Sequence, residues 1–119
     1  MKTVLKYDGS FKGFLTCIFN IYEEKLEVSN ILPAGEAQEE LFSEAAEVIS
    51  QDFKAQRVIK GLKAKISGST LIKIKWAFLS ELPGIEYTLY QFIRYIFSAK
   101  RKVDTVYTHH AVLQTANIA

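Results

Sequence analysis

The sequence predicts an α+β fold that is predominantly helical, with a small two-stranded sheet packed on four or five helices. A run near the N-terminus, Thr3–Tyr7, is rich in β-branched and aromatic residues, which is typical of a strand. Most of the remaining chain repeats its apolar residues every three or four positions, the period of an amphipathic helix. With 119 residues, 49% of them hydrophobic, the chain can bury one core, so we expect a single domain over residues 1–119.

The first helix is predicted directly after this strand. Asp8 and Gly9 form a turn signal, and Ser10 is a good N-cap because its hydroxyl can accept a hydrogen bond from a backbone N–H of the first turn. From there to about Lys25, apolar side chains form one continuous stripe. A helix on this segment would bury the single cysteine, Cys17, as a small hydrophobic residue.

The partner of the first strand is less clearly marked. Residues 26–35 contain Asn30 and Pro33 and are predicted to form an ordered loop. The periodicity of residues 41–49 fits a helix or a strand. We favour a strand, because the backbone groups of an isolated strand at residues 3–7 would need hydrogen-bonding partners. If residues 41–49 formed a helix, the fold would be all-α.

The C-terminal part is predicted to be helical throughout. The expected helices span residues 52–66, 70–81, 85–97 and 105–118. Asp52 and Ser69 are candidate N-caps for the first two of these. The helix over residues 70–81 has two apolar faces, which predicts a central position for it. The residues expected near the core are Trp76, Phe78, Leu89, Phe92 and Phe97.

The charges are divided between the two parts of the chain. Residues 1–52 hold 4 Lys and Arg against 10 Asp and Glu, a net charge of −6, whereas residues 53–119 hold 11 against 3, a net charge of +8. A basic surface beside an acidic one is typical of a protein that binds a polyanion, associates with itself, or does both. A DNA-binding module and a homo-oligomer or protein-docking module are therefore both candidates.

Two groups of cations are candidate contacts to nucleic acid. They are Lys54, Arg57, Lys60 and Lys63, which advance by three residues along one helix, and Arg94, Lys100, Arg101 and Lys102. Cations placed in this way can neutralise phosphates of a nucleic-acid backbone. Three tyrosines near the second group can stack on unpaired bases: Tyr87, Tyr90 and Tyr95. Solvated helix faces and tyrosines at the edge of a core give the same patterns.

An enzyme is the alternative interpretation. A glycosylase-like or nucleotide-processing site would use Glu81 or Glu86 with His109 as acid and base, provided that these side chains converge in a pocket. The spacing marks no nucleophile and no oxyanion donor. For Glu86, a place near a helix start also predicts a simple stabilising role through the helix dipole.

The sequence predicts no metal site and no cofactor. One cysteine excludes an intrachain disulfide, a cysteine-only zinc site and a three-cysteine cluster. His109 and His110 are adjacent, so on a helix they would point about 100° apart and could not share one ion. The apolar stretches are interrupted by charges and no signal peptide follows Lys2 and Lys6, which predicts a cytoplasmic protein without membrane spans.

Three short blocks, taken in their order along the chain, resemble an uncharacterised bacterial family linked to DNA metabolism and DNA repair. The first block is Tyr7-Asp8-Gly9-Ser10-Phe11 with Gly13-Phe14-Leu15-Thr16 and Tyr22-Glu23. The second is Arg57-Val58-Ile59-Lys60-Gly61-Leu62, and the third is Ala77-Phe78-Leu79-Ser80-Glu81 with Pro83-Gly84-Ile85-Glu86. The resemblance implies a radical S-adenosylmethionine protein as partner, and longer members carry a uracil-DNA-glycosylase-like domain after this region. It carries over no catalytic residue. It also implies that this chain is the N-terminal portion of a longer protein and is truncated at its C-terminus.

Overall fold

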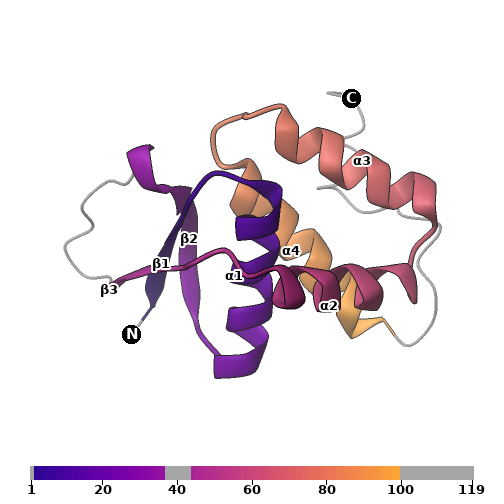
Figure 1. Cartoon of the computed structure of the whole chain (residues 1–119), viewed down its shortest axis with the longest axis horizontal. Helices are drawn as coiled ribbons and strands as arrows, with labels where there is room; N and C mark the ends of the chain where they lie inside the picture. Colours follow the sequence, from indigo (N-terminus) through magenta and orange to yellow (C-terminus); the bar gives the residue numbers. More distant parts are fainter. Residues whose placement is uncertain (1, 37–43, 100–119) are drawn as a thin grey trace. The chain divides into compact units, whose positions relative to one another are not determined.

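The computed structural model describes residues 2–36 and 44–99 (Figure 1). Within these residues the fold is α+β and mostly helical, with four α-helices and a three-stranded parallel sheet. The predicted fold class is therefore confirmed, the all-α alternative is wrong, and the sheet has one strand more than expected. The helix predicted over residues 105–118 lies outside the described residues. The chain divides into two units, Met1–Val58 and Ile59–Ala119, which we describe separately.

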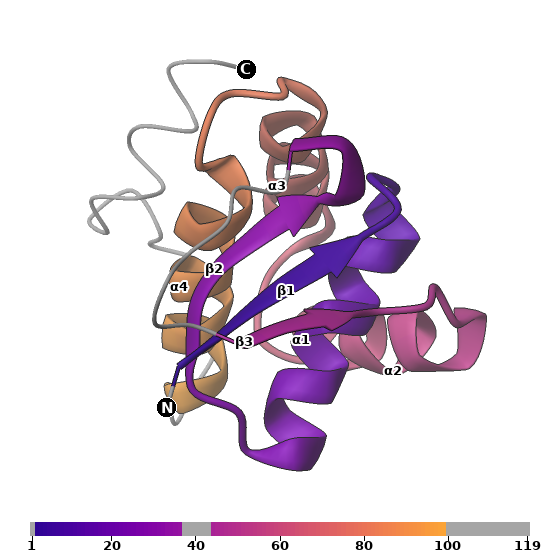
Figure 2. The same cartoon turned by 90° about the vertical axis from the view of Figure 1, so that its left-hand side faces the viewer.

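The first unit contains the sheet. Its elements in chain order are β1 (Thr3–Tyr7), α1 (Phe11–Glu24), β2 (Val28–Pro33), the short 3-10 helix η1 (Ala34–Glu36), β3 (Glu44–Glu47) and the beginning of α2 (Asp52–Lys63). The strand order is β2-β1-β3, and both outer strands run parallel to β1 (Figure 2). A parallel connection between β1 and β2 needs a crossover, which α1 supplies.

The central strand β1 explains why the N-terminal segment is so apolar. Val4, Leu5 and Tyr7 are all buried, as expected for a strand with neighbours on both sides. α1 packs on β1, where the ring centres of Tyr7 and Phe14 are 6.5 Å apart. Cys17, on the same helix, is fully buried, so its prediction as a small hydrophobic residue is confirmed.

The predicted loop over residues 26–35 is wrong, because Val28–Pro33 forms the strand β2. The register with β1 is irregular: Thr3 pairs with Val28 but Val4 pairs with Asn30, so Ser29 is skipped. The Asn30 side chain accepts a hydrogen bond from the Ile31 N–H at 2.9 Å. This bulge breaks the strict alternation of a strand, and Pro33 is tolerated because it ends an edge strand.

The strand predicted over residues 41–49 is present but short. Of that range, residues 41–43 lie outside the described part, and β3 spans Glu44–Glu47. The pairing with β1 extends one residue further, since the Val48 N–H donates to the Lys6 carbonyl at 2.7 Å. Thr16 on α1 holds the segment between β3 and α2 in place, because its buried hydroxyl accepts a hydrogen bond from the Gln51 N–H at 3.2 Å.

The second unit is built from the end of α2, α3 (Gly68–Leu79) and α4 (Ile85–Ser98). α2 ends at Lys63, earlier than predicted, and Ser67 rather than Ser69 caps α3 by accepting a hydrogen bond from the Thr70 N–H at 3.3 Å. The start of α2 also differs from the prediction, because Asp52 is its first helical residue rather than its N-cap.

Packing within the second unit depends on a close approach at Gly61. A Cβ at this position would lie 3.2 Å from the Phe97 ring of α4, so the glycine that weakens α2 also makes room for its neighbour. The Lys65 ammonium group donates to the Ala99 carbonyl at the end of α4. The large side chains of this unit that are most completely buried are those of Leu62, Leu89, Phe92, Ile93 and Ile96. Two residues that were expected near the core are less buried than predicted: Phe97 is only partly buried, and Trp76 is 55% exposed.

Candidate nucleic-acid interface

The first predicted row of cations lies on α2, and most of it faces solvent. Arg57, Lys60 and Lys63 are exposed, and none of them makes a side-chain hydrogen bond or ion pair with another described residue. Successive members of the row are about 4.5 Å apart along the helix axis. α2 contains no carboxylate after Asp52, its first residue. Positive charge therefore follows this helix without local compensation.

The remaining member of this row, Lys54, is engaged with α1. Its ammonium group lies 5.4 Å from the centre of the Phe19 ring and donates a hydrogen bond to the Asn20 side-chain oxygen at 2.8 Å. The cation thus contacts both a π face and a carbonyl dipole. Lys54 attaches the start of α2 to α1, which leaves Arg57, Lys60 and Lys63 as the members best placed to meet a ligand.

The second predicted group is only partly described. Arg94 is exposed on α4, whereas Lys100, Arg101 and Lys102 lie outside the described residues. Among the nearby tyrosines, Tyr90 is buried and its ring centre is 5.8 Å from that of Tyr87. This pair contributes to packing within the second unit. Tyr95 is 41% exposed and is the tyrosine of this helix with the most accessible ring.

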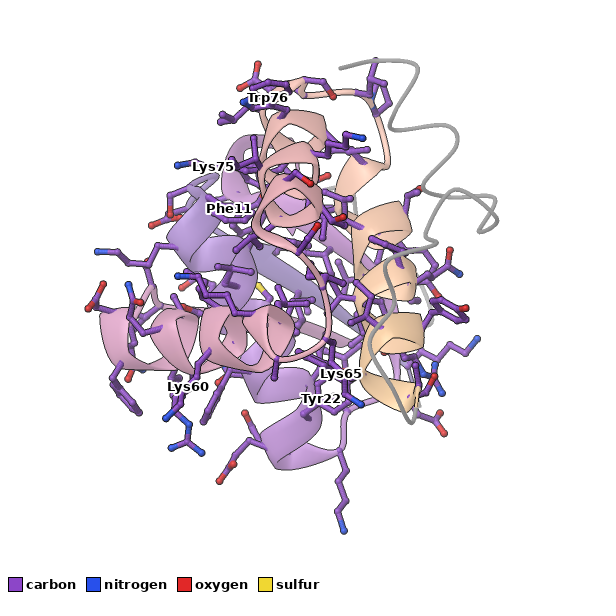
Figure 3. All side chains as sticks on the ribbon, turned by 90° about the vertical axis from the view of Figure 1, so that its right-hand side faces the viewer. Phe11, Tyr22, Lys60, Lys65, Lys75 and Trp76 are labelled. Carbon is purple, nitrogen blue, oxygen red and sulfur yellow. The ribbon has the colours of Figure 1, made fainter. Side chains whose placement is uncertain are left out.

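An exposed face on α3 was missed by the sequence analysis. It consists of Ile72, Lys75, Trp76 and Leu79, which follow the spacing i, i+3, i+4, i+7 along one side of the helix. Figure 3 labels Lys75 and Trp76 on this helix. Its three large apolar side chains are 51%, 55% and 58% exposed in chain order. The opposite side of α3 is buried, through Thr70, Ile74, Ala77 and Phe78. The two apolar faces of α3 predicted a central helix, but only one of them is covered.

The residues of the enzyme alternative occupy different environments. Glu81 is exposed two residues after the end of α3, with a positive backbone φ of 55°. Glu86 is buried in the first turn of α4, where the positive end of the helix dipole stabilises a carboxylate. His109 lies outside the described residues. The described part of the chain gives no geometry in which these groups act on one substrate.

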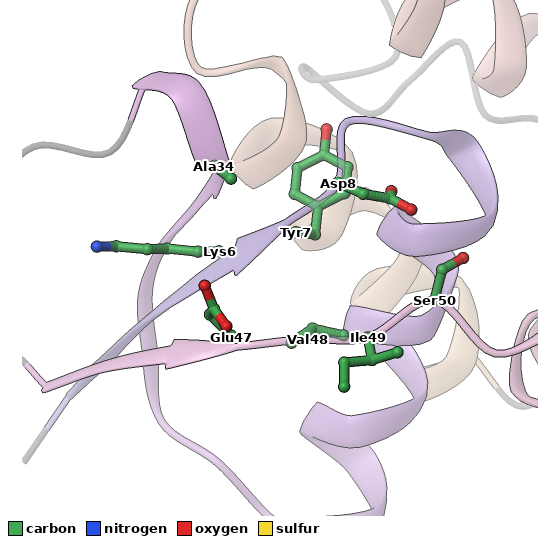
Figure 4. Close-up of a pocket in the computed structure, with 8 residues that line it drawn as sticks. All are labelled: Lys6, Tyr7, Asp8, Ala34, Glu47, Val48, Ile49 and Ser50. Carbon is green, nitrogen blue, oxygen red and sulfur yellow. The ribbon is translucent and has the colours of Figure 1, made fainter.

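A cavity of about 330 Å³ lies at the carboxyl ends of β1 and β3 (Figure 4). This edge of a parallel sheet is where many α/β proteins bind ligands. Here, however, the Lys6 and Asp8 side chains point to opposite sides (Figure 4). One Asp8 carboxylate oxygen already accepts hydrogen bonds from the Ser10 N–H at 2.9 Å and the Ser10 hydroxyl at 2.6 Å. These bonds lower the pKa of Asp8, so it is a poor general acid at neutral pH.

Other site classes find no support in residues 2–36 and 44–99. No three Cys, Asp, Glu or His side chains gather there in a way that would hold a metal ion. None of the helices in this part of the chain is long and apolar enough to cross a membrane. Comparisons with protein-family models, with curated proteins and with solved structures give no match for this chain.

Proposed function

We propose that this chain is a nucleic-acid-binding accessory module of a DNA metabolism or repair system. The exposed cations Arg57, Lys60 and Lys63 contact phosphates, and a partner protein supplies the chemistry. The observation that carries this proposal is that these three side chains lack a carboxylate partner among the described residues. Each phosphate that they neutralise releases counterions, which favours binding at low salt. The resemblance to a DNA-repair family supports the same class of function and suggests a radical S-adenosylmethionine protein as the partner.

Binding is favoured over catalysis by the placement of the acidic candidates. Buried Glu86 has a structural role at the start of α4, and Glu81 stands on open surface. A general acid or base needs a substrate held within hydrogen-bond reach, and neither residue lines the cavity at the carboxyl ends of β1 and β3. Among the described residues, no observation favours the glycosylase-like alternative over binding.

The test is DNA binding by the variant Arg57→Glu/Lys60→Glu, measured by fluorescence anisotropy over a range of salt concentrations. The unchanged protein should bind DNA with an affinity that falls steeply as salt rises. The variant should bind at least about tenfold more weakly, and its salt slope should be shallower by about one for each lost phosphate contact.

A charge-matched control separates the position of the cations from net charge. Lys2→Glu/Lys25→Glu changes the total charge by the same amount at two exposed residues outside α2, and it should leave the affinity within about twofold. Binding that is absent, independent of salt, or equally weakened by both double variants would contradict the proposal. Circular dichroism of each variant establishes that it is folded.

A further inference from the structure

The exposed face of α3 combines an aromatic ring, apolar side chains and a cation. Trp76 is 55% exposed, with Ile72 one turn before it and Leu79 one turn after it along the helix. Lys75 is its neighbour on the exposed side (Figure 3). An exposed tryptophan flanked by two large apolar residues is uncommon on a surface that only meets water. This face is therefore a candidate binding surface.

The helix and the unit that carry this face are basic in composition. α3 contains Lys73 and Lys75 and has no carboxylate between Gly68 and Leu79. The described residues of the second unit, 59–99, hold six Lys and Arg against two Asp and Glu. A second copy of the same helix fits poorly, because pairing two such faces about a twofold axis would bring the Lys75 side chains close together. An anionic occupant with flat apolar surfaces is better matched.

We propose that this face binds unpaired bases of single-stranded nucleic acid, with Trp76 as the stacking platform and Lys75 on a neighbouring phosphate. This inference rests on the proposed function and names its substrate class. Every base has a π face, so an indole ring can stack on it without reading sequence. Ile72 and Leu79 contact the sugar or the next base on either side. Base pairs inside a duplex are already stacked on each other and do not offer this surface.

The experiment uses the fact that Trp76 is the only tryptophan of the chain. Its fluorescence should be quenched by a short oligodeoxythymidine strand and much less by a duplex of the same length. Trp76→Ala should lower the affinity for the single strand by roughly 5- to 150-fold, the effect of losing one stacked base, and leave duplex affinity unchanged. Trp76→Phe keeps a ring and should retain most of the affinity.

Leu79→Ala is the matched control, because it removes a similarly exposed apolar side chain from the same face without removing a π system. It should weaken binding to the single strand much less than Trp76→Ala. Equal losses in both variants would overturn stacking and show that the face holds the strand by general apolar contact instead.

The two proposals fail in different ways. If the protein binds duplex and single strand equally, and Trp76→Ala has no effect, the inference is wrong while the proposed function stands. If neither nucleic acid binds at low salt, both are wrong. Because Trp76 is exposed, its variants should keep the helical signal and the thermal midpoint of the unchanged protein, which verifies that lost binding is not lost folding.

Discussion

Asp8, Ser10 and Gly13 form one hydrogen-bonded group at the start of α1. The Ser10 hydroxyl donates to the Asp8 carboxylate at 2.6 Å and accepts from the Gly13 N–H at 2.9 Å. A side chain at Gly13 would overlap the carboxylate and would approach the Ser10 hydroxyl and the Tyr7 ring to 3.1 Å. These contacts give a structural reason for an aspartate, a serine and a glycine at these three positions.

Gly13→Ala should therefore destabilise the protein, although alanine favours helices. Overpacking at a filled position costs about 1–3 kcal/mol, which exceeds the gain of about 1 kcal/mol in helix propensity. The free energy of unfolding, measured by urea titration, should fall. In an Asp8→Ala background the same substitution should cost less, because the overlapping group is gone.

Gly68→Ala provides the control for this prediction. Gly68 is the first residue of α3, and a Cβ there would meet nothing within 4 Å. That substitution should be neutral or slightly stabilising. Equal destabilisation at both glycines would show that the Asp8 contact does not limit position 13.

At the level of the elements, α1 and α3 are each followed by a residue with an unfavourable backbone conformation. Lys25 caps α1 in the left-handed region with φ of 53°, and Glu81 follows α3 with φ of 55°. The Leu26 N–H donates to the Ile21 carbonyl at 3.0 Å, a bond typical of a helix end with a left-handed residue. Glycine is the usual residue there because a Cβ is strained at positive φ.

Lys25→Gly and Glu81→Gly should each raise the free energy of unfolding by about 0.5–1 kcal/mol. Urea titration measures this, with Gln56→Gly inside α2 as a control that should lower stability by a similar amount. A loss of stability in Glu81→Gly would mean that contacts of the Glu81 side chain stabilise the protein by more than the backbone strain costs. The prediction would then be wrong for this residue.

At the scale of the whole molecule, the acidic and basic parts of the chain provide charges for self-association. The Debye length, beyond which salt screens the attraction between opposite charges, is about 30 Å at 0.01 M salt and about 3 Å at 1 M salt. The average mass in sedimentation equilibrium should therefore rise with protein concentration at low salt and return to that of a monomer at high salt. Association that strengthens at high salt would instead implicate the exposed apolar face of α3.

The predictions from sequence agree with the structure where the interactions that decide an element act between residues close together in the chain. The strand β1, the Ser10 cap of α1 and the start of α4 at Ile85 were predicted correctly. Caps, turn residues and a helical period act within a few residues, so the local sequence contains them. The row of cations on α2 was predicted for the same reason, and its exposure follows from the helical period.

The strand β2 and the exposure of Trp76 were decided only by the tertiary structure. β2 exists because β1, more than twenty residues away in the chain, offers it hydrogen-bonding partners, and its bulge at Ser29 removes the local pattern of a strand. Trp76 belongs to a face that is apolar enough for a core but is left uncovered by the fold. The sequence by itself determined which faces are apolar or basic, whereas long-range pairing and packing decided which of them meet solvent.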